Sequence, residues 1–97
     1  MPALKIAIAQ INCTVGDLAA NANSIVAAAR RAQTLGAHVL VTPELGLCGY
    51  PPEDLLLRPD FYRACERELN RLAQTAPIPV IVGHPEEAEN GKRYNSA

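Results

Sequence analysis

Short apolar segments alternate with two segments of helical periodicity along this chain. Residues 4–11 are almost continuously apolar, as in a strand that is covered on both faces of a parallel or layered sheet. Residues 38–42 form a second, β-branched strand, and residues 80–83 a third. A hairpin follows, because Asn90-Gly91 is a typical turn sequence from which residues 93–95 can return the chain.

The helices are predicted from apolar residues that recur three and four positions apart. In the first, Asp17 is a candidate N-cap, Gly36 ends the helix in the left-handed conformation, and Asn21 is expected on a polar side. In the second, Asp60 is the candidate cap and Pro77 lies at the end. The predicted apolar faces are Leu18, Ala22, Ile25, Ala29 and Ala32 in the first helix and Phe61, Cys65, Leu69, Leu72 and Ala76 in the second.

The predicted order is β-α-β-loop-α-β-hairpin, which places the chain in the α/β class with parallel neighbouring strands. The loop at residues 46–52 is irregular, and Pro52 can open a short helical turn whose first acids are Glu53 and Asp54. Strands this apolar need a second covering layer. We therefore expect residues 1–97 to be part of a larger domain and, taken alone, to leave one sheet face bare and to associate.

Composition narrows the possible functions. With nine basic and ten acidic residues, the formal net charge is −1, so a nucleic-acid or anionic-membrane partner is not expected. No apolar run approaches the roughly 20 residues that span a bilayer, and the start lacks the features of a signal peptide. Cys13, Cys48 and Cys65 form no C-x-x-C pair, which favours a cytoplasmic location. No metal-ligand spacing joins His38 or His84 to each other or to a cysteine, and the sequence has no glycine-rich motif that could cradle a phosphate. No metal or cofactor is therefore expected in these residues.

Glu44 is the leading candidate for chemistry. It follows Pro43 at the carboxyl end of the second strand, and ligands of layered α/β sheets bind beyond such ends. Apolar neighbours (Leu45, Leu47 and Tyr50) would disfavour its charged form, as a general base near neutral pH requires. The alternative is a solvated loop glutamate or a helix-capping acid.

Two other loop residues invite a functional interpretation. Cys48 lies close to Glu44, but a catalytic thiolate is usually stabilised by a cation or a helix N-terminus, and neither is evident. We therefore expect Cys48 to pack on the core, and Cys13 and Cys65 to be structural as well. Tyr50, which is held between a glycine and two prolines, either lines or gates a substrate pocket or only packs the loop down.

These residues resemble the nitrilase, or carbon–nitrogen hydrolase, superfamily. The resemblance rests on the first strand, the turn at residues 15–17 and the Pro-Glu at residues 43–44. The string from Pro43 to Pro59 is similar to one branch, the glutamine amidohydrolase domain of glutamine-dependent NAD synthetases, as are residues 82–85 and 94–97. Within that string, Pro-Pro-Glu-Asp-Leu-Leu-Leu is the motif that is specific to this branch. The chain departs from this branch at two positions. The branch often has proline where this chain has Cys13, and serine or threonine where this chain has Cys48.

The resemblance implies that residues 1–97 are the N-terminal part of a four-layer αββα sandwich with a Glu-Lys-Cys triad. Glu44 would be the general base, while the lysine, the nucleophilic cysteine and a synthetase domain that uses ATP and Mg would lie beyond Ala97. The cysteine would attack the side-chain amide of glutamine, the lysine would stabilise the oxyanion, and ammonia would pass to deamido-NAD adenylate.

The same resemblance implies a homo-oligomeric full-length enzyme that acts on glutamine, deamido-NAD and ATP. The 97 residues alone would then be inactive, because one carboxylate cannot form an acyl-enzyme. Two alternatives remain at this point: a stand-alone nitrilase-type amidase, and a non-catalytic domain that uses the sheet for assembly.

Overall fold

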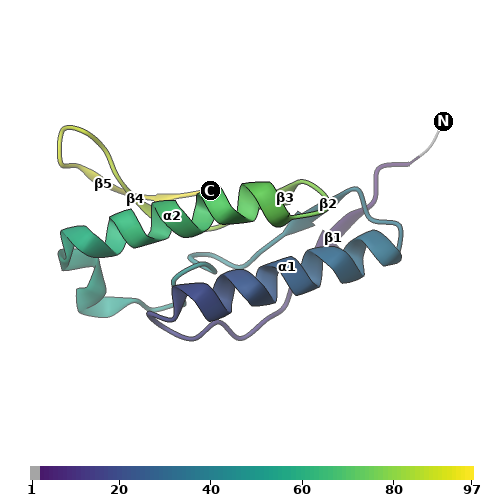
Figure 1. Cartoon of the computed structure of the whole chain (residues 1–97), viewed down its shortest axis with the longest axis horizontal. Helices are drawn as coiled ribbons and strands as arrows, with labels where there is room; N and C mark the ends of the chain where they lie inside the picture. The colour runs from purple at the N-terminus through teal and green to yellow at the C-terminus, as the bar shows by residue number, and fades with distance from the viewer. Residues whose placement is uncertain (1–2) are drawn as a thin grey trace.

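The computed structural model describes residues 3–97, apart from the side chains of Glu53 and Asp54. The predictions for those two acids therefore lie outside the described residues. The observed elements are β1 (Ile6–Ile8), α1 (Leu18–Thr34), β2 (Val39–Val41), the 3-10 helix η1 (Glu53–Leu57), α2 (Pro59–Thr75), β3 (Val80–Ile81), β4 (His84–Glu87) and β5 (Arg93–Ser96) (Figure 1). The predicted order and the α/β class are confirmed.

The strands form two small sheets. β1, β2 and β3 are parallel in that order, and Leu40 in the central strand pairs with Ala7 on one side and Val80 on the other. β4 and β5 form a separate antiparallel pair joined by the predicted hairpin, in which Gly91 has a φ of +80°. The three parallel strands are shorter than predicted, because their regular pairing is confined to residues 6–8, 39–41 and 80–81.

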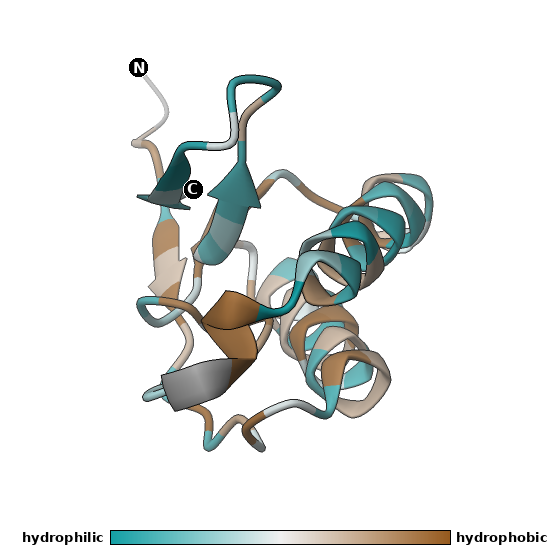
Figure 2. Ribbon diagram, turned by 90° about the vertical axis from the view of Figure 1, so that its left-hand side faces the viewer, coloured by the Kyte–Doolittle hydropathy of each residue, from teal (hydrophilic) through white to brown (hydrophobic). Residues whose placement is uncertain are grey.

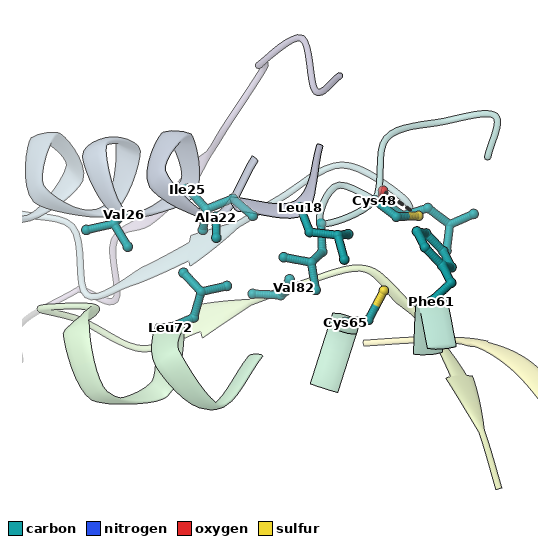
Figure 3. Packing of buried hydrophobic residues seen from close by; sticks show 11 residues of the cluster. Leu18, Ala22, Ile25, Val26, Cys48, Phe61, Cys65, Leu72 and Val82 are labelled. Atoms are coloured by element: carbon teal, nitrogen blue, oxygen red, sulfur yellow. Dashed lines mark hydrogen bonds between the residues drawn. The ribbon is translucent and has the colours of Figure 1, made fainter. Parts of the chain in front are cut away.

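Both long helices lie side by side on one side of the three-stranded sheet (Figures 1 and 2). Their predicted apolar faces meet the loop after β2 in one core, while Ala29, Ala32 and Leu40 form a smaller one. Figure 3 shows how residues of α1, α2 and the loop converge in the larger core. Its buried members are Leu18, Ala22, Ile25, Val26, Leu45, Leu47, Cys48, Phe61, Cys65, Leu72 and Val82.

The helix ends follow local chemistry, with one correction. Asp17 caps α1 by accepting a hydrogen bond from the backbone N–H of Ala20 at 3.2 Å, and Gly36 follows the helix with a φ of +85°, as predicted. The cap predicted at Asp60 is wrong: α2 begins at Pro59, and Asp60 lies inside the first turn. Proline suits that first position because its φ is already helical and its missing N–H would have no helical partner.

The opposite face of the parallel sheet is open. Ile6, Ile8 and Ile81 retain 57%, 74% and 48% of their accessible surface. The prediction that residues 1–97 taken alone leave one sheet face bare is therefore confirmed for the described residues. Within this part of the chain, no helix combines the length and the apolar character needed to cross a membrane.

Candidate active site

The carboxyl end of β2 is held tightly before the chain reaches Glu44. The backbone N–H and the side-chain hydroxyl of Thr42 both donate to the carbonyl of Ile81, at 3.0 and 2.9 Å. The same hydroxyl accepts a hydrogen bond from the N–H of Gly83 at 3.3 Å. The segments after β2 and β3 are thus joined where the sheet ends, and Glu44 follows two residues later.

The chain turns sharply after Glu44. Leu45 has a φ of +50°, in the left-handed region that costs a branched side chain roughly 1 kcal/mol or more. The turn is closed by hydrogen bonds from Gly46 N–H to the Pro43 carbonyl and from Gly49 N–H to the Leu45 carbonyl, both 2.9 Å. It buries Leu45 and leaves Glu44 exposed. Backbone conformations of this kind concentrate at functional sites, where the surrounding contacts maintain them.

Glu44 and Tyr50, the two predicted site residues, line the same cavity of about 140 Å³. Its remaining walls are Ile11, Asn12, Cys13, Pro43 and Gly46, so the loop after β1 forms one side. Tyr50 is 65% exposed and does not pack the loop down, which favours its interpretation as a pocket residue. A cavity of about 440 Å³ between the end of α2 and β3 is larger but does not contain Glu44.

The environment of Glu44 differs from the expected one. Leu45 and Leu47 belong to the core, so they do not surround the carboxylate, and Glu44 itself is exposed. Its Oε1 instead accepts a hydrogen bond of 2.6 Å from the side-chain amide of Asn95 on β5. The prediction of apolar surroundings is therefore wrong for Leu45 and Leu47, whereas Tyr50 lines the same cavity as Glu44. Sequence reasoning assigned no role to Asn95, because nothing local links residues that are 51 positions apart.

Asn21 is a second residue that lies elsewhere than predicted. It was expected on a polar side of the first helix, but it is buried, with only 2% of its surface exposed. Its amide accepts from the N–H of Thr14 at 2.8 Å and donates to the carbonyls of Thr14 and Leu47 at 2.7 and 3.0 Å. One buried side chain of α1 thus joins the loops after β1 and β2, which form the two walls of the Glu44 cavity.

Asn21→Ala should lower the free energy of unfolding by about 1–3 kcal/mol, because the Thr14 N–H and the buried Leu47 carbonyl would lose their partner. Asn23→Ala is the matched control on the same helix; Asn23 is exposed and accepts one hydrogen bond, from Arg71 at 3.1 Å. That change should stay within about 0.5 kcal/mol. Urea unfolding followed by circular dichroism measures both changes. Equal losses of stability in the two variants would show that the hydrogen bonds of Asn21 with Thr14 and Leu47 do not stabilise the fold.

The cysteines lack the features of an activated thiol. Cys48 and Cys65 lie in the core (Figure 3), and burial raises the pKa of the Cys48 thiol to about 11 and that of Cys65 to about 12. The packing role predicted for Cys48 is confirmed by its complete burial. Cys13 lines the Glu44 cavity, but partial burial raises its pKa as well. A nucleophile needs the opposite shift, toward the thiolate.

Residues 3–97 contain no candidate cluster of metal-ligating side chains. Within this range, no group of three or more His, Cys, Asp or Glu side chains could hold a metal ion. Both histidines have local structural roles: His38 Nδ1 accepts from the Lys5 N–H at 2.9 Å, and His84 Nδ1 lies 3.2 Å from the Pro85 carbonyl oxygen.

Comparisons with known proteins support the resemblance. Residues 5–97 match the carbon-nitrogen hydrolase family model. The chain is 50% identical to a glutamine-dependent NAD(+) synthetase of Synechocystis sp. over 95% of its own length and 18% of the relative's. It is 37% identical to the synthetase of Acinetobacter baylyi over 100% of its length and 18% of the relative's. The chain thus spans less than a fifth of these relatives.

Solved structures give the same result. The glutamine-dependent NAD+ synthetase of Acinetobacter baumannii, determined with ADP, superposes with a TM-score of 0.90 at 33% identity, over 95% of this chain and 18% of that one. An amidase of the nitrilase superfamily from Nesterenkonia has a TM-score of 0.73 at 30% identity, over 84% of this chain and 32% of the amidase. The nitrilase-type α/β fold is therefore confirmed, and the chain belongs to the carbon-nitrogen hydrolase family.

Proposed function

We propose that these residues form part of the glutaminase active site of a glutamine-dependent NAD synthetase, with Glu44 as its general base. The observation that carries the proposal is the 50% identity to the Synechocystis synthetase over 95% of this chain. The position of Glu44 supports it, beyond the end of β2 and beside the cavity that Tyr50 also lines. Substrates would be glutamine, deamido-NAD and ATP, in the cytoplasm and in a homo-oligomer.

In this mechanism Glu44 accepts the proton of a cysteine thiol, and the thiolate attacks the amide carbon of glutamine. Glu44 then gives that proton to the amide nitrogen, so the tetrahedral intermediate expels ammonia and leaves a thioester, which water hydrolyses to glutamate and the free thiol. The bond from Asn95 occupies Glu44 Oε1, so Oε2 is available for the transferred proton. Ammonia would then react with deamido-NAD that ATP has activated on the synthetase part.

We place the nucleophile and the oxyanion-stabilising lysine outside these 97 residues. Supporting this, Cys48 and Cys65 are buried, and the pKa of all three thiols is raised by burial. The four-layer sandwich would likewise be completed by residues outside the chain. The 97 residues alone should be inactive as a glutaminase.

A stand-alone amidase is the second candidate, because the Nesterenkonia amidase has a TM-score of 0.73. Its identity to this chain is 30%, against 50% for the Synechocystis synthetase, which favours the first candidate. Formation of NAD from deamido-NAD and ATP, with glutamine or ammonium as the nitrogen source, separates the two. An enzyme that hydrolyses amides but forms no NAD would support the amidase.

The cysteine assignment has its own test. Replacing Cys13, Cys48 and Cys65 together by Ser or Ala in the full-length protein should leave a thiol that still forms a covalent adduct with an electrophilic glutamine analogue. The expectation follows because none of the three thiols is activated. Mass spectrometry of the digested adduct locates the labelled cysteine. An adduct on Cys13 or Cys48 in the unsubstituted protein would contradict the assignment.

A further inference from the structure

We infer that Asn95 is a positioning residue for Glu44: its side-chain amide holds one carboxylate oxygen and so fixes the base in its productive orientation. The inference rests on the proposed role of Glu44. Its starting point is the bond of 2.6 Å from Asn95 Nδ2 to Glu44 Oε1, which joins β5 to the loop after β2. Glu44 is exposed, so without this bond its flexible side chain would be free to sample other rotamers.

The strand that carries Asn95 is itself anchored. Arg93 lies two residues earlier on the same face of β5, and its guanidinium stacks 5.1 Å from the ring centre of Tyr62 on α2. Arg93 Nε also donates to Glu87 Oε2 at 2.9 Å, across the β4–β5 pair. The hydroxyl of Tyr62 in turn donates to the carbonyl of Leu56 at 2.6 Å. These contacts hold β5, and with it Asn95, in a fixed position relative to α2 and β4.

The partner strand is locked to the Glu44 loop as well. The N–H of Leu47 donates to the carbonyl of Gly83 at 3.1 Å, immediately before β4 begins. Gly83 lies so close to the loop that a Cβ there would be 2.6 Å from the Leu45 nitrogen and 2.7 Å from the Pro43 oxygen. Pro85 of β4 pairs with Asn95 of β5, so the close approach at Gly83 also sets the distance between Asn95 and Glu44.

Asn95 is the polar group that the structure places against the Glu44 carboxylate. The titratable groups that share the Glu44 cavity are Cys13 and Tyr50. On β5, the charge of Arg93 is engaged by Glu87 and Tyr62. Removing the hydrogen bond from Asn95 should therefore let the Glu44 side chain leave the orientation in which it accepts the thiol proton.

The test compares Asn95→Ala, Asn95→Asp and the control Asn70→Ala, an exposed asparagine of α2, in the full-length protein. Glutamine hydrolysis is measured as kcat and KM, and ammonia-dependent NAD formation reports folding. Asn95→Ala should lower kcat about 10- to 100-fold with little change in KM. Asn95→Asp keeps the size of the side chain but, when ionised, cannot donate a hydrogen bond to the carboxylate, so it should lose kcat at least as strongly. Asn70→Ala should match the wild type.

An equal loss of the glutamine-dependent and the ammonia-dependent activity would overturn the inference, because it would indicate a purely structural role. Wild-type kinetics in Asn95→Ala would overturn it too. If Asn95→Ala does not fold, Asn95→Asp decides: its kcat for glutamine hydrolysis must fall while ammonia-dependent NAD formation is retained. A Glu44→Gln variant measured alongside separates the role of Glu44 from the role of Asn95. If Glu44→Gln hydrolyses glutamine normally, the proposed function fails. If Glu44→Gln is inactive and Asn95→Ala is normal, only the role of Asn95 fails.

Discussion

Glu44→Gln in the full-length protein should abolish glutamine-dependent NAD synthesis and leave synthesis from added ammonia nearly intact. The amide keeps the size and the shape of the carboxylate but cannot accept the thiol proton. Removing a general base typically costs about 10² to 10⁴ in rate. Ammonia reacts without amide hydrolysis, so that route does not need Glu44. Both rates are measured as NAD formed from deamido-NAD and ATP, with glutamine or ammonium supplied.

Glu66→Gln is the matched control, because Glu66 is an exposed glutamate of α2 that does not line the Glu44 cavity. It should leave both activities unchanged. If Glu44→Gln lowers both activities equally, the effect is on folding or on the synthetase part. If it retains the glutamine-dependent activity, Glu44 is not the base.

Gly83→Ala should have the second-largest effect, since the added methyl group would meet backbone rather than a movable side chain. Its Cβ would lie 2.6 Å from the Leu45 nitrogen, 2.7 Å from the Pro43 oxygen and 3.2 Å from the Glu44 carbonyl carbon. Overpacking of this kind costs about 1–3 kcal/mol, and the upper part of that range is expected here. Because the displaced atoms flank Glu44, glutamine hydrolysis should fall as well. Urea unfolding and the glutamine-dependent assay measure the two effects.

The control is Gly91→Asn in the β4–β5 turn, where a Cβ would meet nothing within 4 Å. Gly91 has a φ of +80°, which asparagine tolerates better than most residues, so the loss should stay below about 1 kcal/mol. Wild-type stability and activity in Gly83→Ala would mean that the segments after β2 and β3 can separate, which would remove the basis for a rigidly placed Glu44.

The helices and the order of elements were predictable because their signals are local. Asp17 caps α1 through Ala20, three residues away, and Gly36 supplies the left-handed residue after its last turn. Periodic apolar residues selected the buried faces, since side chains three and four apart lie on the same side of a helix. Asp60 was misplaced because an acid and a proline both favour a helix start, and here the proline at residue 59 occupies the first position.

The environment of the candidate base was not predictable in the same way. Leu45 and Leu47 follow Glu44 closely in sequence, yet the positive φ of Leu45 turns the chain so that these side chains enter the core while Glu44 stays outside. Asn21 is polar, and a helical pattern places it away from the core. It is buried because loops from two other elements present Thr14 and Leu47 to it.

The sequence by itself therefore determined the α/β order, the family resemblance and the position of Glu44 beyond the end of the second strand, since all three are written in neighbouring residues. Only the tertiary structure decided which groups surround that carboxylate. Asn95 reaches Glu44 across 51 residues because β5 is anchored on α2 through Arg93 and Tyr62. Gly83 permits the close approach that brings β4 to the Glu44 loop. Such contacts depend on how separate elements pack, and no local pattern encodes the distance between them.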